Sequence, residues 1–248
     1  MAPAFDVVLF DYGHTLVDLQ RPETHLLEAY REINVRLEKE LERHVPDAAE
    51  LLVSVSERVD KKIGHSYHQG SEQEVDITEL YRDALDKIGI TCPPGTLEWV
   101  MEQEQAAWFN GVLPSPHARS VLETLKGEGV RLAIVSNAAY SPQSMRDQLH
   151  FLDLFDLFDA TIYSSEVGVR KPNPAIYEEA LRQTAAPRAR TLFIGDRVRE
   201  DVRGPRSCGI TAVMTHEFRQ EHAGPELDVE VLPDLSGVPA LVFNTRLT

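Results

Sequence analysis

The sequence predicts an α/β protein with a mostly parallel sheet and an inserted all-helical domain. Short, nearly continuous apolar runs, typical of strands buried on both faces, alternate with segments of helical periodicity. Such alternation indicates β-α-β crossovers, which produce parallel strand pairs. A long interval after the first apolar run contains helical periodicity only, and this interval predicts the insertion.

The predicted strands are rich in β-branched, aromatic and other apolar residues. They lie at residues 7–10, 132–135, 160–163, 192–194 and 211–214. The helical patterns between the later strands lie at residues 118–127, 141–149, 174–184 and 199–208. A last apolar stretch at 229–232, followed by 235–242, is expected to add an edge strand and a closing helix.

The helical interval covers residues 20–110. Apolar residues recur in it at helical spacing, as in Tyr30, Ile33 and Leu37, and the same pattern returns within 51–63, 77–88 and 97–109. We therefore predict a core formed by residues 1–19 and 111–248, with a helical domain at 20–110. Turn residues at 19–22 and 110–116 place both chain crossings at one edge of the core, where they are predicted to form a hinge.

Composition restricts the partners. The 248 residues include 25 basic and 40 acidic side chains, a formal net charge of −15. This balance argues against duplex nucleic acid or an anionic membrane as a partner, because both are bound mainly through Lys and Arg. The two cysteines, Cys92 and Cys208, lack metal-ligand spacing. With no signal peptide and no apolar run of about 18 residues, a cytoplasmic location is expected. A monomer and a homodimer are both consistent with the sequence.

Candidate polar residues follow three of the predicted strands, and one more lies in an intervening loop. They are Asp11, Ser136, Asn137, Lys171, Asp196 and Asp201. Ligands of parallel α/β sheets bind at the carboxyl ends of the strands. Carboxylates from two adjacent strands suit Mg²⁺, and the lysine balances their charge. An ionised Asp11 could attack phosphorus in line and form an aspartyl-phosphate, while Ser136 and backbone N–H groups hold the transferring oxygens.

Four short motifs contain these residues. The pattern D-x-D-x-T-L is represented by Asp11-Tyr12-Gly13-His14-Thr15-Leu16, and S/T-N by Ser136-Asn137. A lysine before a proline and a helix is Lys171-Pro172, and G-D-x(4)-D runs from Gly195-Asp196 to Asp201. With these motifs in this order, the chain resembles the haloacid dehalogenase superfamily of hydrolases over nearly its whole length.

The resemblance implies a Rossmann-like core with a helical type I cap that closes over the substrate. It implies Asp11, Ser136, Lys171 and Asp196 as catalytic residues, with Asp11 as the nucleophile. The implied Mg²⁺ ligands are Asp11, the backbone carbonyl of Gly13, Asp196 and Asp201. The implied substrate-binding residues are Gly13, His14, Ser136, Asn137 and Lys171, and His14 stands where the family usually has a glycine whose N–H lies next to the phosphate.

Gly13 departs from the family pattern. Phosphatases of the family carry at this position a second aspartate, which protonates the leaving group and later activates water. General acid–base catalysis is typically worth ~10²–10⁴-fold, so hydrolysis of alkyl phosphates is expected to be slow unless another group substitutes. His14 is one candidate for this group, because histidine side chains titrate near neutrality. The alternative for His14 is a structural or substrate-contact role. The basic residues of segment 61–68 are another candidate, if the cap closes over the site.

Three functions are consistent with these residues. The leading one is a Mg²⁺-dependent phosphohydrolase or phosphotransferase acting on a small phosphorylated metabolite. A 2-haloacid dehalogenase would need no acid at Gly13, but the dehalogenases have a tyrosine two residues after the nucleophile, and Tyr12 stands one residue after it. A phosphate-binding or regulatory protein with little turnover is the third, although a binding protein has little need of an in-line nucleophile. The substrate itself is not predicted.

Overall fold

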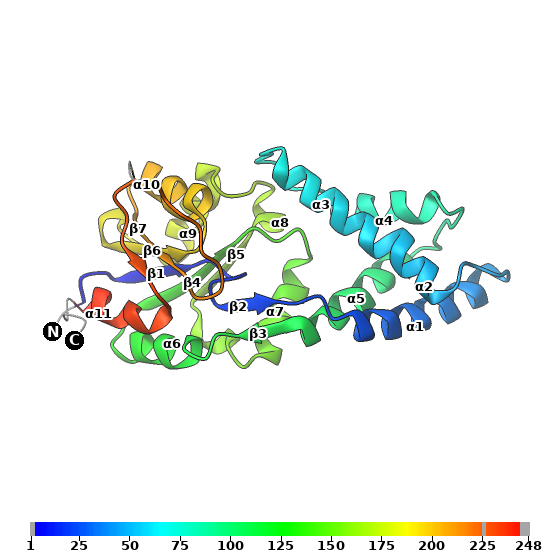
Figure 1. Ribbon diagram of the computed structural model, residues 1–248, viewed down its shortest axis with the longest axis horizontal. Coiled ribbons are helices and arrows are strands. Elements are labelled where there is room, and N and C mark those ends of the chain that lie inside the picture. The colour runs from blue at the N-terminus through cyan, green and yellow to red at the C-terminus, as the bar shows by residue number, and fades with distance from the viewer. Residues whose placement is uncertain (1–2, 225–226, 244–248) are drawn as a thin grey trace.

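The computed structural model describes residues 3–224 and 227–243, so the ends of the two predicted core segments, 1–2 and 244–248, lie outside the described residues. Six strands form one sheet in the order β5-β4-β1-β6-β7-β8, and every neighbouring pair is parallel (Figure 1). They are β1 (Val7–Phe10), β4 (Arg131–Ser136), β5 (Ala160–Tyr163), β6 (Thr191–Gly195), β7 (Thr211–Thr215) and β8 (Val231–Leu232). The predicted α/β class and parallel sheet are confirmed.

Both faces of the sheet are covered, which is why its strands consist mostly of apolar residues. The helices α6 (Ala118–Gly127), α7 (Pro142–Phe151) and α11 (Val238–Val242) pack on the face that contains Phe10 and Ile134. The helix α9 (Pro174–Thr184) and a π-helical segment (Val198–Arg203), continued by α10 (Gly204–Ser207), pack on the face that contains Leu9 and Val135. The closing helix expected after the last strand is therefore present.

The central strand β1 positions the candidate site. Phe10 pairs with Ile134 of β4 on one side and with Ile194 of β6 on the other. The residues that follow these three strands consequently emerge side by side at one edge of the sheet. Because the chain order reverses on either side of β1, this edge is a topological switch point, where parallel α/β sheets bind ligands.

The helices of residues 23–108, which we call the insert, lie beyond this edge of the sheet (Figure 1). Its helices are α1 (Glu23–Leu41), α2 (Ala48–Leu51), α3 (Arg58–His68), α4 (Ile77–Asp86) and α5 (Thr96–Trp108), with a π-helical segment (Leu52–Glu57) joining α2 to α3. Their apolar faces meet in a separate cluster that includes Tyr30, Ile33, Leu37, Val55 and Tyr81. The helical spacing seen in the sequence thus corresponds to real helices.

The two chain crossings form a short ribbon, which the sequence did not predict. The strand β2 (Val17–Leu19) pairs with β3 (Val112–Pro114) in antiparallel fashion. Gln20 donates its N–H to the carbonyl of Gly111 at 2.8 Å, and a Cβ at Gly111 would lie 1.9 Å from the Gln20 oxygen. Only glycine permits this approach of the two backbones. The predicted hinge region is therefore a hydrogen-bonded pair of strands.

The insert contacts the core at a second place, through the loop at 72–74. Gln73 forms an antiparallel bridge with Val169, and the N–H of Arg170 donates to the Glu72 carbonyl at 2.7 Å. The Glu74 N–H donates to the Gly168 carbonyl at 3.0 Å. The insert is thus fixed to the loop that leads into Lys171. Within the part of the chain that the structure describes, no helix has both the length and the apolarity needed to cross a membrane.

Candidate active site

Three carboxylates meet at the edge of the sheet beyond β1 and β6. Asp11, Asp196 and Asp201 are all buried, and one oxygen from each lies within 4.8 Å of the others. The Lys171 Nζ lies between two of them, at 2.7 Å from Asp11 Oδ1 and 2.7 Å from Asp201 Oδ1. The structure therefore brings together the four charged residues that the sequence placed at strand ends and in the loop before α9.

Asp201 is held by the turn that follows β6. Its Oδ2 accepts the N–H groups of Asp196 at 3.1 Å and Arg197 at 2.9 Å. A Cβ at Gly195 would lie 2.4 Å from the Asp201 Cγ. The carboxyl group packs directly against this glycine, which is a physical reason for the spacing in Gly195-Asp196-x(4)-Asp201.

Only one of the two carboxylate oxygens of Asp196 has a hydrogen-bond partner among the described residues. Its Oδ2 accepts a hydrogen bond from Arg219 Nη1 at 2.7 Å. Its Oδ1 is buried and has no hydrogen-bond partner among the described residues. An unpaired buried carboxylate oxygen is costly, and a cation beside it removes that cost. The donor set is made of hard oxygens, which Mg²⁺ prefers.

Electrostatics at this cluster follow from three carboxylates sharing one buried ammonium. Burial raises the pKa of Asp11 despite the opposing attraction of Lys171, and it raises the pKa of Asp201 to about 6. The pKa of Asp196 is raised by burial and then by the charge of Asp201. Burial lowers the pKa of Lys171, but attraction from Asp11 and Asp201 outweighs it and leaves the pKa raised. The lysine stays charged, and the carboxylates have excess negative charge for a metal ion to neutralise.

Ser136 and Asn137 follow β4 directly. Asn137 holds the backbone of Lys171, because its Oδ1 accepts the Lys171 N–H at 2.7 Å and its Nδ2 donates to the Lys171 carbonyl at 3.2 Å. Ser136 is 5% exposed and lies on the wall of the same cavity. The asparagine thus connects the end of β4 to the loop before α9 and fixes the lysine between the carboxylates.

Gly13 and His14 form a tight turn after Asp11. His14 has a φ of 60°, in the left-handed region, and its N–H donates to the Val17 carbonyl at 2.6 Å. The turn therefore occupies this N–H, and a substrate-binding role of His14 stays a prediction. The His14 Nδ1 lies 3.4 Å from Asp18 Oδ1. Burial, followed by the nearby Arg219, lowers the pKa of His14.

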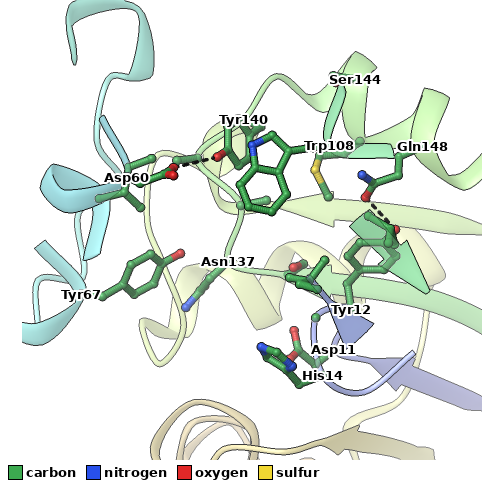
Figure 2. Close-up of a pocket in the computed structure, with 18 of the residues that line it drawn as sticks. Asp11, Tyr12, His14, Asp60, Tyr67, Trp108, Asn137, Tyr140, Ser144 and Gln148 are labelled. Carbon is green, nitrogen blue, oxygen red and sulfur yellow. Dashed lines mark hydrogen bonds between the residues drawn. The ribbon is translucent and has the colours of Figure 1, made fainter. Parts of the chain in front are cut away.

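A cavity of about 470 Å³ lies between this edge and the insert. Asp11, Gly13, His14, Ser136, Asn137 and Lys171 line it, whereas Asp196 and Asp201 lie behind the wall formed by Asp11. Of segment 61–68, Ile63 and Tyr67 line the cavity, in place of the lysines and histidines that were considered for proton transfer. Tyr67 points from α3 into the cavity, and burial raises its pKa, so its hydroxyl remains a donor (Figure 2).

Arg219 is a site residue that sequence reasoning missed. It lies four residues beyond β7, lines the cavity and binds Asp196. The signal was available, because β7 belongs to the same parallel sheet and the residues after its end face the same edge. The predicted site residues at strand ends follow only the first, second and fourth predicted strands.

Comparison with known proteins gives consistent matches. A sequence model of haloacid dehalogenase-like hydrolases matches residues 5–209. A glyceraldehyde 3-phosphate phosphatase from Methanothermobacter thermautotrophicus is 34% identical over 128 residues, which cover 50% of this chain and 56% of the relative. A phosphatase of the same name from Methanopyrus kandleri is 26% identical over 227 residues, covering 92% of this chain and 90% of the relative.

Among solved structures, a 2-haloacid dehalogenase from Pseudomonas syringae pv. Tomato DC3000 superposes with a TM-score of 0.67 at 22% identity, covering 96% of this chain and 97% of that one. At this identity the likeness shows the fold alone. The chain spans little more than half the length of the first of the two phosphatases.

Proposed function

The chain belongs to the haloacid dehalogenase-like hydrolase family, and we propose that it is a Mg²⁺-dependent phosphohydrolase or phosphotransferase acting on a small phosphorylated metabolite. The observation that carries this proposal is the buried cluster of Asp11, Asp196 and Asp201 around Lys171, with one oxygen of Asp196 unpartnered. The phosphatase names of relatives that match half or more of this chain support the same reaction class.

The donor set fits Mg²⁺. Asp11, Asp196 and the Gly13 carbonyl would hold it, with Asp201 supporting the site from behind. When bound, the ion would neutralise charge on the transferring phosphoryl group and on the carboxylates.

The residues of the chain account for the first half of the reaction. Lys171 holds Oδ1 of Asp11, which favours the ionised carboxylate and leaves Oδ2 for in-line attack on phosphorus. A bond forms between Asp11 and phosphorus while the bond to the leaving oxygen breaks. The Ser136 hydroxyl and the Lys171 ammonium stabilise the transferring oxygens.

In the second half, water attacks the aspartyl-phosphate, inorganic phosphate leaves and the Asp11 carboxylate is regenerated. An acceptor hydroxyl in place of water would make the reaction a phosphotransfer. Gly13 offers no carboxyl group for either proton transfer. The first step is therefore expected to depend strongly on how well the leaving group departs unprotonated.

The test is phosphate release from acetyl phosphate, which is small and has a good leaving group. We expect release to require Mg²⁺, to stop with a chelator and to be abolished by Asp11→Asn. Asp147→Asn, the same change at an exposed position on α7, is the matched control and should keep full activity. Absence of turnover above the Asp11→Asn background would overturn the proposal.

Two further outcomes separate the alternatives. Calorimetric binding of Mg²⁺ and inorganic phosphate without turnover would favour a phosphate-binding protein, a reading motivated by the absence of an acid at Gly13. Chloride release from 2-chloropropionate that is indifferent to chelator would favour a dehalogenase.

A further inference from the structure

The cavity has two ends of different chemistry. The end at the sheet carries charged and polar groups, including Asp11, Lys171 and Arg219. The other end is lined by large apolar and aromatic side chains, namely Ile63, Trp108, Tyr140 and Met145, whereas Leu19 lies beside Gly13 at the sheet end. Figure 2 shows the ring of Trp108 in the middle of this far end, with Tyr140 and Asp60 on one side and Tyr12 and Gln148 on the other. We call Ile63, Trp108, Tyr140 and Met145 the aromatic end.

Several polar side chains near the aromatic end are already engaged with one another. The Tyr12 hydroxyl donates to Gln148 Oε1 at 2.7 Å. Arg21 forms an ion pair with Asp60, to which the Tyr140 hydroxyl donates at 3.4 Å. The indole N–H of Trp108 is buried and has no partner among the described residues, so it can donate to one acceptor of a ligand. A leaving group rich in hydroxyls would still lose its water without gaining the engaged groups as partners, and burying an unpaired polar group is unfavourable. An apolar group gains from the same transfer, by roughly 25 cal/mol for each Å² buried.

The size of the cavity points in the same direction. Its volume of about 470 Å³ lies within the roughly 300–1,000 Å³ typical of pockets that bury drug-sized ligands. A three-carbon phosphate would fill only part of this volume. The cavity therefore suits a leaving group of at least one ring.

The chemistry at Gly13 adds an independent constraint. A phenolic hydroxyl has a pKa of about 10, against about 15.7 for water, which a simple alcohol resembles. A phenolate can depart without a proton, whereas an alkoxide needs one. A site whose nucleophile lacks the usual acid nearby, next to an aromatic compartment, is suited to an aryl ester.

We propose that the substrate of this chain is the phosphomonoester of an aromatic hydroxyl compound, whose ring occupies the aromatic end against Trp108. This inference rests on the proposed function and specifies its substrate class. The phosphorus–oxygen bond to the ring breaks as Asp11 bonds to phosphorus, the electron pair leaves on the phenolate oxygen, and the phenolate takes a proton from solvent water. Ring-to-ring contacts of this kind favour offset or edge-to-face packing.

The test compares kcat/KM for five phosphates that vary ring and leaving group separately. Acetyl phosphate has a good leaving group and no ring, phenyl and 2-naphthyl phosphate have both, and benzyl phosphate has a ring on an alcohol. Geranyl phosphate has an aliphatic hydrophobic group. We expect 2-naphthyl phosphate to exceed phenyl phosphate at least tenfold and benzyl phosphate to fall below phenyl phosphate by ~10²–10⁴-fold.

The possible failures are distinguishable. If acetyl phosphate is hydrolysed through Asp11 but 2-naphthyl phosphate is no better than phenyl phosphate, the ring gains nothing from the aromatic end, the inference is overturned and the proposed function stands. If geranyl phosphate exceeds 2-naphthyl phosphate, the compartment serves aliphatic groups and the inference is also overturned. If acetyl phosphate itself is not hydrolysed, the proposed function fails first.

The two tryptophans of the chain provide matched variants. Both lie on α5, but Trp108 lines the cavity, whereas Trp99 lies under Arg36, whose Cζ is 4.3 Å from the centre of its ring. Trp108→Leu should raise KM for 2-naphthyl phosphate at least tenfold and lower its kcat/KM relative to acetyl phosphate by a similar factor. Trp99→Leu should leave that ratio unchanged. Equal losses for both substrates in Trp108→Leu would indicate a structural role and contradict the inference.

A binding measurement covers the case in which Trp108→Leu does not fold. In Asp11→Asn protein that also carries Trp99→Phe, Trp108 is the remaining fluorophore of its kind. Addition of 2-naphthyl phosphate should change its fluorescence with saturation, whereas acetyl phosphate should not. No saturable change with 2-naphthyl phosphate would place its ring elsewhere and overturn the inference.

Discussion

The ion pair between Arg170 and Glu74 should contribute more to stability than any other single contact between the insert and the core. Arg170 is fully buried and Glu74 is 3% exposed. Arg170 Nε and Nη2 donate to Glu74 Oε1 at 2.8 and 2.5 Å, and its Nη1 donates to Ser66 Oγ at 3.0 Å. The guanidinium also lies 3.9 Å from the ring of Tyr67. Three of these four residues belong to the insert.

The change Glu74→Gln keeps the shape of the side chain and removes its charge. Breaking a buried ion pair from one side typically costs about 3–5 kcal/mol, because the other charge stays buried and unpaired. The serine and the tyrosine ring remain as partners of Arg170, so we expect the lower value, about 3 kcal/mol. For a chain of this size, one kcal/mol shifts Tm by about 2–4 °C, which predicts a loss of roughly 6–12 °C.

The assay is thermal unfolding of Glu74→Gln beside Glu72→Gln. Glu72 is in the same loop, but its carboxylate is 41% exposed and 3.6 Å from Arg199. Exposed pairs are worth about 0–1 kcal/mol, so the control should lose no more than about 4 °C. Replacing both Arg170 and Glu74 by methionine should recover much of the stability, since apolar replacement of a buried pair is often neutral or better. Equal losses in Glu74→Gln and Glu72→Gln would refute the reasoning.

The remaining predictions concern the candidate site. Gly13→Asp should raise kcat for benzyl phosphate by roughly 10²–10⁴-fold, whereas the control Gly13→Asn should give no gain. The structure has room for this change, because a Cβ at position 13 would lie 3.0 Å from Leu19 Cδ1, the end of a side chain that is 40% exposed and can shift. Mg²⁺ at a hundredfold excess over its Kd should stabilise the protein by about 2.7 kcal/mol, which thermal unfolding measures as a rise in Tm. Asp196→Asn should remove this rise in Tm. No rise in Tm of the unsubstituted chain would contradict the metal site. Burial raises the pKa of Asp201 to about 6, above about 3.9 when unfolded, so its contribution to metal-free stability is full below about pH 4 and is lost as pH rises through 6. Mg²⁺ affinity, which requires the ionised carboxylate, should instead rise between pH 4 and 6; calorimetric titrations showing no such rise would be incompatible with this pKa.

The sheet was predictable because its strands are buried on both faces. The expected strand at 7–10 matches β1, and the one at 192–194 lies within β6 (Thr191–Gly195). The ribbon of β2 and β3 was not predictable, since each strand has three residues and β2 contains Asp18. Its existence depends on pairing between segments almost a hundred residues apart, for which local propensity gives no signal.

The candidate site shows the same division. Asp11, Asp196 and Asp201 were identifiable because the end of a buried strand is visible in the sequence and parallel strands end at one edge. Arg219 could have been found by the same rule. The contact of Arg170 with Glu74 could not, because 96 residues separate them and an arginine before a lysine looks like part of a charged loop until the structure shows it buried.

The aromatic end of the cavity and the absence of an acid at Gly13 both favour aryl esters over esters of alcohols, although the two features lie in different parts of the sequence. A carboxyl group at position 13 would matter most for esters of alcohols. The aromatic end disfavours alcohols rich in hydroxyls, because Tyr12 is paired with Gln148 and Arg21 with Asp60. For an aryl ester, the absence of the acid carries little kinetic penalty in the first step, and the ring gains burial against Trp108. The substitution at Gly13 is therefore compatible with an efficient enzyme, provided that its substrate is of the class that the cavity favours.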